Sequence, residues 1–166
     1  MSYLWGLDLS LSNTGIAIID LNTYNPILVD SVKTKQNKKL NERDDHKERI
    51  KLITDRFDEL NNTYPASIVA IEAPFVQHNK STKAIMKVHG VTQRWFYHVP
   101  QYYYAPTTIK ATIIYGQAKK EFVKEKLKLV YPYIECKNND ESDALAIAIT
   151  YLIKNKLIKW DKKLKQ

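Results

Sequence analysis

Four acidic side chains of this chain occupy positions that suggest chemistry. Asp8 lies in an apolar run, Glu72 directly follows another, and Asp140 and Asp143 open a segment rich in Ala, Ile and Leu. Carboxylates seldom lie beside buried apolar runs unless they are paired or bind a metal ion. Because Asp140 and Asp143 are three residues apart, a helix would place both on one face, where they can bind the same ion.

The acids predict a metal centre with oxygen ligands. If the strands that carry Asp8 and Glu72 are neighbours in a sheet, all four carboxylates converge near one edge of that sheet. Carboxylates without Cys or clustered His favour Mg²⁺, with Mn²⁺ as a substitute, over Zn²⁺. Such ions bind a scissile phosphate, lower the pKa of a bound water and stabilise the leaving oxygen, which is the chemistry of a nuclease.

Each acid also has a purely structural interpretation. Asp140 can act as a helix N-cap, and Asp143 can be a charge that the helix dipole favours. Glu72 can be a polar residue at the end of a strand. Asp8 is harder to explain in this way, since both of its neighbours are leucines and no basic residue lies within its strand. Taken together, the four acids favour a metal site.

Composition restricts the class of protein. The chain has 166 residues, of which 44% are hydrophobic and 27% charged, so we expect one globular domain. The formal net charge of +8 indicates a polyanionic partner, with nucleic acid as the first candidate. Cys136 is the single cysteine, which excludes an intramolecular disulfide and favours a reducing compartment. We expect a cytoplasmic protein without a membrane segment, because no apolar run approaches roughly 18 residues.

The pattern of apolar residues predicts an α/β domain with a mixed sheet flanked by helices. The early part contains three short strands that suggest an antiparallel meander, then a lysine-rich loop and a helix around Ile50 to Leu60. The expected strands are residues 3–9, 15–21, 27–33, 68–71 and 101–104. The later helices are expected at residues 81–97, 106–116, with Gly116 as C-cap, and 122–130.

The last helix is expected to begin near Asp140, with Asn139 or Asp140 as its N-cap. The predicted domain comprises residues 1–153. A basic tail follows over residues 154–166, and we expect it to be frayed in solution.

Several motifs resemble the RuvC family of Holliday junction resolvases, in particular its phage-type members. An apolar stretch with Asp and a later Thr-Gly, a Glu followed three residues later by Phe, and the run Asp-x-x-Asp-Ala-Leu-Ala-Ile-Ala all occur in order. They are present as Gly6-Leu7-Asp8 with Thr14-Gly15, Glu72 with Phe75, and Asp140 to Ala148. Lys110 and Lys120 lie in settings similar to those of the two family lysines near the scissile phosphate.

The resemblance implies a ribonuclease H-like fold with a five-stranded mixed sheet. It implies that the four acids are the metal ligands, that Lys110 and Lys120 contact backbone phosphate, and that Phe75 wedges into the junction. The working unit would be a homodimer that binds four-way and forked DNA in the cytoplasm, which is that of the host if the chain is phage-encoded. Paired nicks would leave a 5′-phosphate and a 3′-hydroxyl.

The chain also departs from the family pattern. Leu9-Ser10 replaces Pro-Gly after the first acid, and residues 88–93 replace a run that carries an arginine. We therefore expect less selectivity for DNA sequence, since base selectivity needs side chains that reach base edges. A lysine face that includes Lys119, Lys120 and Lys124 either contacts DNA or is a solvated surface.

Aromatic and histidine residues give weaker signals. Tyr102, Tyr103 and Tyr104 fit an aromatic strand better than a base-stacking platform. His78 and His89 are at most minor candidates for proton transfer.

Two other functions fit part of this pattern. A non-catalytic protein that binds branched DNA would keep the basic surface, but four unpaired carboxylates repel one another without an ion. A phosphotransferase of the actin-like superfamily also begins with an apolar strand, Asp and a Ser/Thr loop. That fold needs two such domains, and the chain has the length of one.

Overall fold

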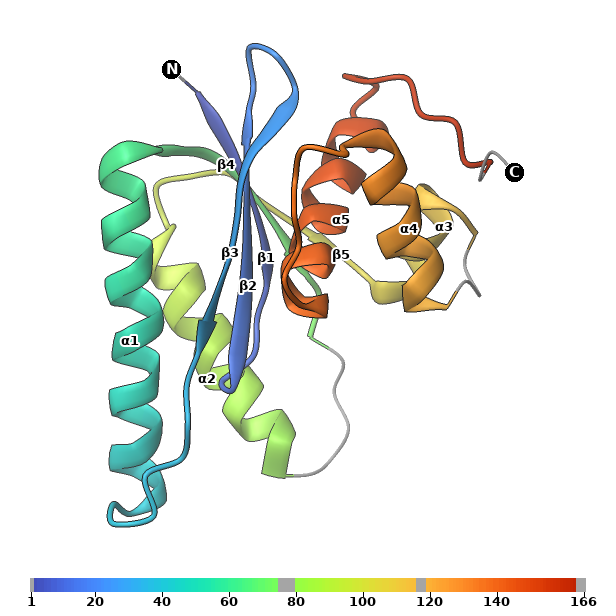
Figure 1. Cartoon of the computed structure of the whole chain (residues 1–166). Coiled ribbons are helices and arrows are strands. Elements are labelled where there is room, and N and C mark those ends of the chain that lie inside the picture. Colours follow the sequence, from blue (N-terminus) through green and yellow to red (C-terminus); the bar gives the residue numbers. More distant parts are fainter. Residues whose placement is uncertain (1, 75–79, 116–118, 164–166) are drawn as a thin grey trace.

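Five strands form one mixed sheet in the order β3-β2-β1-β4-β5 (Figure 1). The computed structural model describes residues 2–74, 80–115 and 119–163. The strands are β1 (Tyr3–Asp8), β2 (Asn13–Asp20), β3 (Asn25–Lys33), β4 (Ala66–Glu72) and β5 (Gln101–Tyr104). The first three pair antiparallel, whereas β4 pairs parallel with β1, and β5 with β4. The predicted antiparallel meander and mixed sheet are confirmed.

Helices cover both faces of the sheet. One face carries α1 (Glu42–Thr63) and α2 (Lys80–Trp95), and the other carries α3 (Pro106–Ile113), α4 (Lys120–Val130) and α5 (Asn139–Lys154) (Figure 1). Each helical layer forms its own hydrophobic cluster with the sheet between them. Within the described ranges, no helix combines the length and the apolar character needed to cross a membrane.

The two faces of the sheet differ in the size of their side chains. Successive side chains of a strand point to opposite faces, so Trp5 and Leu7 pack toward α1 and α2 while Leu4 packs toward α5. Ile19 also packs on this side, but near the start of α5 the central strands carry small residues such as Ala17 and Ala70. Small residues let the backbone of α5 lie close to the sheet, which determines where the start of this helix is placed.

Two helix ends differ from the sequence prediction. The N-cap of α5 is Asn138, whose side chain accepts a hydrogen bond from the backbone N–H of Glu141 at 3.0 Å. Asn138 has the extended backbone that an N-cap requires, so the prediction of Asn139 or Asp140 is wrong by one or two residues. Helix α3 ends at Ile113, not at residue 116, and the proposed cap Gly116 lies outside the described residues.

The chain beyond α5 packs against α3 and α4. The indole of Trp160 donates a hydrogen bond to the Ile113 carbonyl at 2.8 Å and stacks on the ring of Tyr131, which is the C-cap of α4. Lys126 is only 6% exposed and donates to the Lys163 carbonyl at 2.7 Å. The expectation of a frayed tail is therefore wrong as far as residue 163, because Trp160, the one aromatic residue of the tail, packs against α3 and α4.

Candidate active site

Two of the predicted acids lie at the ends of neighbouring strands. Asp8 is the last residue of β1 and Glu72 is the last residue of β4. These strands pair in parallel, with Leu7 opposite Ile71. Because parallel strands end at the same edge of a sheet, the two carboxylates emerge side by side, as the sequence predicted.

Helix α5 brings Asp140 and Asp143 to the same edge. Its first turn lies directly on β2, because Gly15 has no side chain. A Cβ atom at Gly15 would lie 2.1 Å from the carbonyl oxygen of Asp140, and one at Gly6 would lie 2.3 Å from that of Ala144. Any larger residue would push the helix away from the sheet. The two glycines therefore control the distance between the acids of α5 and those of the strands.

The carboxylates influence one another electrostatically. Burial raises the pKa of Asp8 to about 7, and the charges of Glu72 and Asp143, with a smaller effect from Asp140, raise it in the same direction. Burial, followed by the charge of Asp143, also raises the pKa of Glu72. The structure thus brings the other three predicted acids close enough to Asp8 for each to raise its pKa, and such clusters are common at functional sites.

Both predicted lysines adjoin the acids. Lys120 donates from Nζ to Oδ2 of Asp143 at 2.5 Å. Lys110, Lys120, Glu72 and Asp143 line one small pocket of about 90 Å³ between α3, α4 and α5. The charges of both lysines oppose the rise in the pKa of Glu72. Two cations next to buried carboxylates can hold a bound phosphate against the acids, which alone would repel it.

Asn13 is a site residue that the sequence reasoning missed. It is the first residue of β2, and its Nδ2 donates to Oδ2 of Asp140, 127 residues away in the chain. Ser10 holds the backbone of Asn13, since its Oγ accepts from Asn13 N at 3.0 Å and donates to Asn13 O at 2.8 Å. The loop that the sequence identified only as a turn therefore supports the acidic cluster. The available signal was an Asn directly before Thr-Gly.

The donor set fits a divalent cation of the Mg²⁺ class. All the converging ligands are oxygens, and burial of several like charges is unfavourable without a cation among them. Among the described residues, no three or more His, Cys, Asp or Glu side chains are already grouped so that they could hold a metal ion. Asp143 and Asp140 each have one oxygen paired, with Lys120 and Asn13 respectively.

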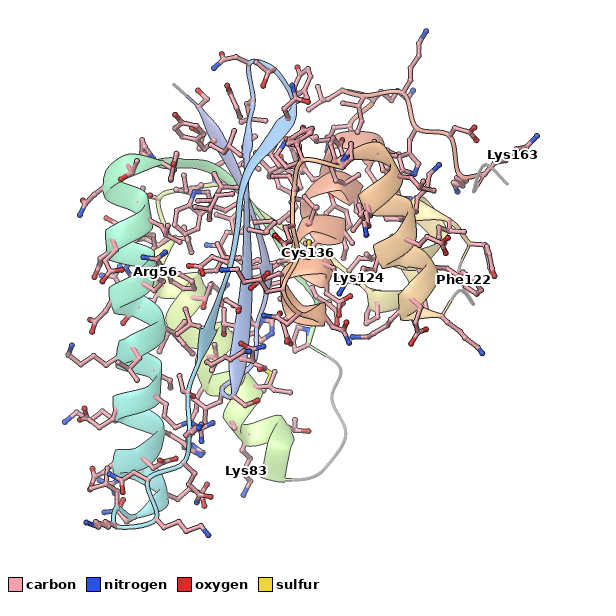
Figure 2. All side chains as sticks on the ribbon, viewed as in Figure 1. Arg56, Lys83, Phe122, Lys124, Cys136 and Lys163 are labelled. Atoms are coloured by element: carbon pink, nitrogen blue, oxygen red, sulfur yellow. The ribbon has the colours of Figure 1, made fainter. Side chains whose placement is uncertain are left out.

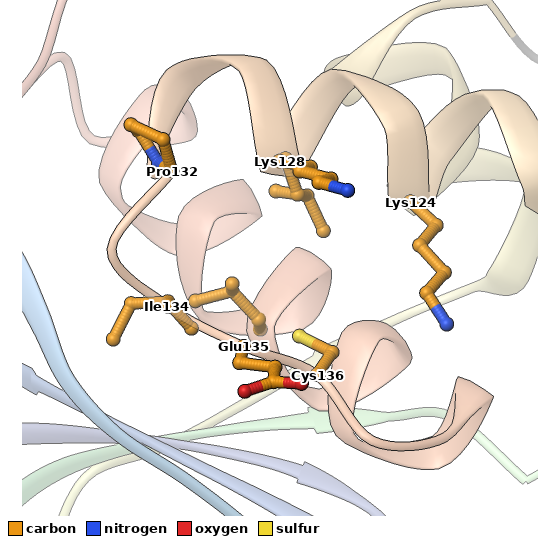
Figure 3. Close-up of a pocket in the computed structure, with 8 residues that line it drawn as sticks. Lys124, Lys128, Pro132, Ile134, Glu135 and Cys136 are labelled. Carbon is orange, nitrogen blue, oxygen red and sulfur yellow. The ribbon is translucent and has the colours of Figure 1, made fainter.

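The remaining predicted residues lie away from the acids or outside the described part. Lys119 is the exposed N-cap residue of α4. Lys124 is half-buried and lines a larger pocket of about 470 Å³ with Lys128 and Cys136, between α4 and the segment before α5 (Figure 3). None of the four acids lines that pocket. Phe75, the predicted wedge, lies outside the described residues, as does His78.

The predicted lysine face lies on α4. Figure 2 shows Lys124 and Phe122 on α4, on the opposite side of the sheet from Arg56 of α1. Lys126 is buried under the tail and does not belong to this exposed face.

His89 is 7% exposed on α2, and burial lowers its pKa. Tyr102 to Tyr104 form the edge strand β5, as predicted.

Comparison with known proteins identifies the chain's relatives. Residues 4–151 match the family model described as crossover junction endodeoxyribonuclease RuvC. Proteins of that name from Rickettsia massiliae and Rhizobium johnstonii are each 30% identical to this chain. The first match covers 89% of this chain and 95% of the relative, and the second covers 88% and 86%.

Solved structures agree with the fold. Thermus thermophilus RuvC in complex with a Holliday junction substrate is similar at a TM-score of 0.73, with 21% identity, over 95% of this chain and 96% of that chain. The yeast mitochondrial Holliday junction resolvase Ydc2 is similar at a TM-score of 0.57, with 15% identity, over 91% and 79%. The ribonuclease H-like architecture expected from the resemblance is confirmed.

Proposed function

Because this chain belongs to the RuvC family of crossover junction endodeoxyribonucleases, we propose that it cuts four-way DNA with the acidic cluster at the ends of β1 and β4. The observation that carries this assignment is that Lys110 and Lys120 line one pocket with Glu72 and Asp143. Such a site can hold a phosphodiester and a divalent cation together. The products are paired nicks with a 5′-phosphate and a 3′-hydroxyl.

Asp8, Glu72, Asp140 and Asp143 would hold the cation, which we propose to be Mg²⁺, with Mn²⁺ as a substitute. A divalent cation in such a site supplies Lewis-acid chemistry, lowering the pKa of a water molecule and stabilising charge on the phosphate. Desolvation and the charges of Glu72 and Asp143 raise the pKa of Asp8, and a bound cation would oppose these effects. Oxygen-only donors support the choice of Mg²⁺ over Zn²⁺.

Lys120 and Lys110 would orient the scissile phosphate. Lys120 donates to Asp143 at 2.5 Å, and its two other N–H bonds are available to phosphate oxygens. Lys110 lines the same pocket from α3. Together they offset the negative charge of the acids, so that a phosphate can approach them. Lys119 and Lys124 extend this positive surface along α4. They would contact backbone phosphates of the DNA strand that is cut. We also propose Phe75 as the residue that wedges into the junction, as the family resemblance implies.

We propose that the working unit is a homodimer, since paired nicks across a junction need two sites. Met86 and Val91 of α2 are large apolar side chains that are 46% and 37% exposed. With Ile50 of α1 they line a pocket of about 400 Å³ between α1 and α2, whose lining also includes the basic side chains of Arg43, His46, Lys47 and Lys87. An exposed apolar surface of this kind favours a protein interface. Its position opposite α4 leaves the acids accessible.

The test is cleavage of a synthetic mobile four-way junction. We expect paired nicks in Mg²⁺ and none in Ca²⁺, with a linear duplex of the same sequence as the control substrate. Asp143→Asn should abolish cleavage and leave junction binding intact, because it removes a metal ligand and a negative charge near phosphate. Normal cleavage by this variant would contradict the site assignment. Binding without cleavage by the unaltered chain would instead support a non-catalytic branched-DNA protein.

A further inference from the structure

Asn13 has a side-chain oxygen that is unexplained by the fold. Its Nδ2 donates to the Asp140 carboxylate, whereas its Oδ1 is buried and has no hydrogen-bond partner in the part of the chain that the structure describes. A buried amide oxygen without a partner costs on the order of 1–3 kcal/mol. Such atoms are rare in native proteins, and where they occur an ion or a water molecule is often bound to them.

The orientation of this amide is determined by its neighbour. If the oxygen and nitrogen of the Asn13 amide were exchanged, an amide oxygen would face the Asp140 carboxylate, and the two would repel each other. The Nδ2 donor must therefore face Asp140. Oδ1 is bonded to the same carbon as Nδ2, so it lies at the same edge of the sheet as Asp140 but takes no part in that hydrogen bond.

The loop before β2 holds Asn13 in place. Ser10 bonds both the N–H and the carbonyl of Asn13. The Thr14 hydroxyl donates to the Ser10 carbonyl at 2.7 Å, which closes the loop on itself. Ser10 stands where the resembling family has Gly, which could not make the first two bonds. The departure in this loop and the orientation of Asn13 are thus parts of one arrangement.

We propose that Asn13 is a fifth side chain of the metal site, in which Nδ2 orients Asp140 and Oδ1 is an oxygen donor to the bound divalent cation. This inference rests on the proposed function, because it concerns the same cation. Amide carbonyl oxygens are ordinary ligands of such cations in proteins. A neutral donor adds a ligand without adding a negative charge to a cluster that already holds four carboxylates.

Metal affinity measured by calorimetry on the full chain without DNA tests the proposal. Asn13→Leu keeps a similar side-chain volume and removes both polar atoms. We expect it to weaken the Kd for Mn²⁺ by roughly 10–100-fold, the usual loss when a group that supports a metal ligand is removed. The matched control is Asn22→Leu. Asn22 also donates from Nδ2 to an aspartate, Asp20, at 2.9 Å, but at the other end of β2. The Kd of Asn22→Leu for Mn²⁺ should therefore equal that of the unaltered chain.

Asn13→Asp separates the two atoms of the amide. It keeps an oxygen toward the cation and loses the Nδ2 donor that orients Asp140, so its loss of affinity for Mn²⁺ should be smaller than that of Asn13→Leu. If Asn13→Asp loses as much affinity as Asn13→Leu, the role of Oδ1 is overturned. If Asn13→Leu does not fold, as judged by thermal unfolding in EDTA, Asn13→Ala replaces it with the same expectation.

Two further outcomes separate this inference from the proposed function. Failure of the unaltered chain to bind Mn²⁺ would overturn the metal-dependent function itself, and the inference with it. If the unaltered chain binds Mn²⁺ and Asp8→Asn does not, the metal site stands. An unchanged Kd for Asn13→Leu in that case overturns only the assignment of Asn13.

Discussion

Asp8 is a half-buried carboxylate with other carboxylates around it, and this arrangement favours metal binding over stability. Its pKa rises from 3.8 to about 7 through burial and the charges of Glu72 and Asp143. Between these values the folded chain binds one proton more than the unfolded chain. The free energy of unfolding therefore falls as pH rises through this window, and stays low above it.

Asp8→Asn should stabilise the metal-free chain at pH 8 and have little effect near pH 4. We expect a gain on the order of 1 kcal/mol at pH 8, which corresponds to roughly 2–4 °C in Tm for a chain of this size. Thermal unfolding in EDTA at the two pH values measures it. An equal change in Tm at both would show that the substitution acts through packing and not through charge.

Lys120 connects the acids to the proposed phosphate. Lys120→Ala should lower the single-turnover cleavage rate and reduce the salt dependence of junction binding. The slope of log K against log salt should fall by about 0.9, the contribution of one phosphate contact. Binding is measured in Ca²⁺ between low and moderate salt.

Lys51→Ala is the matched control for this change. Lys51 pairs with Asp55 on exposed α1, across the sheet from the acids, so its removal also deletes one positive charge. Its slope should match that of the unaltered chain. A slope that falls equally in both variants would mean that net charge, and not a contact at Lys120, determines the salt dependence.

At the scale of elements, the tail after α5 joins the two helices that carry the lysines. The Trp160 indole donates a hydrogen bond to the Ile113 carbonyl at the end of α3, one turn after Lys110. It also stacks on Tyr131, the C-cap of α4, and α4 begins with Lys120. The tail was expected to be frayed because its composition is basic. The contact of its partly buried indole shows that the tail is part of the fold and supports the layer that holds the site.

Trp160→Ala should destabilise the chain by about 1–3 kcal/mol and slow cleavage at temperatures well below its Tm. Trp95→Ala is the control, since Trp95 is a half-buried indole that donates to Asp58 on the far side of the sheet. It should lower Tm to a similar degree and leave the single-turnover rate unchanged. Equal rates for the two variants would restrict Trp160 to a role in stability.

For the whole molecule, the proposed paired nicks require two copies of the chain. Met86→Glu should convert the proposed dimer into a monomer, because it places a charge in the exposed apolar surface of α1 and α2. Leu129→Glu is the control, since Leu129 is 54% exposed on α4 in the opposite layer. Light scattering measures the mass. A dimer that persists in Met86→Glu would exclude this surface as the interface.

Selectivity for DNA sequence also belongs to this scale. Of residues 88–93, Val88, His89 and Thr92 are buried, so half of this run faces the interior and cannot reach DNA. We expect nicks at several sequences near the branch point of a migrating junction, paired across opposite strands. Mapping the nicks on such a junction measures this. Nicks confined to one short motif would show that other side chains read the bases.

Much of the fold followed from local patterns. The strands and most helices were predicted because apolar spacing reflects the period of each element and is read over a few neighbouring residues. Three features were not predicted correctly, because each depends on contacts with distant parts of the chain. They are the end of α3, the cap of α5 and the packing of the tail. Trp160 meets Ile113 across 47 positions, and no local pattern indicates that contact.

Residue types alone were enough to predict the chemical class of the site. Four acids at strand and helix ends, two lysines and a basic surface indicate metal-dependent cleavage of a phosphodiester, since ligand type follows from residue type. Only the tertiary structure decided how these groups meet. Gly15 lets α5 lie on β2, which brings Asp140 within reach of Asn13. Such a contact depends on the distance between two backbones, and that distance is set by packing of the whole layer.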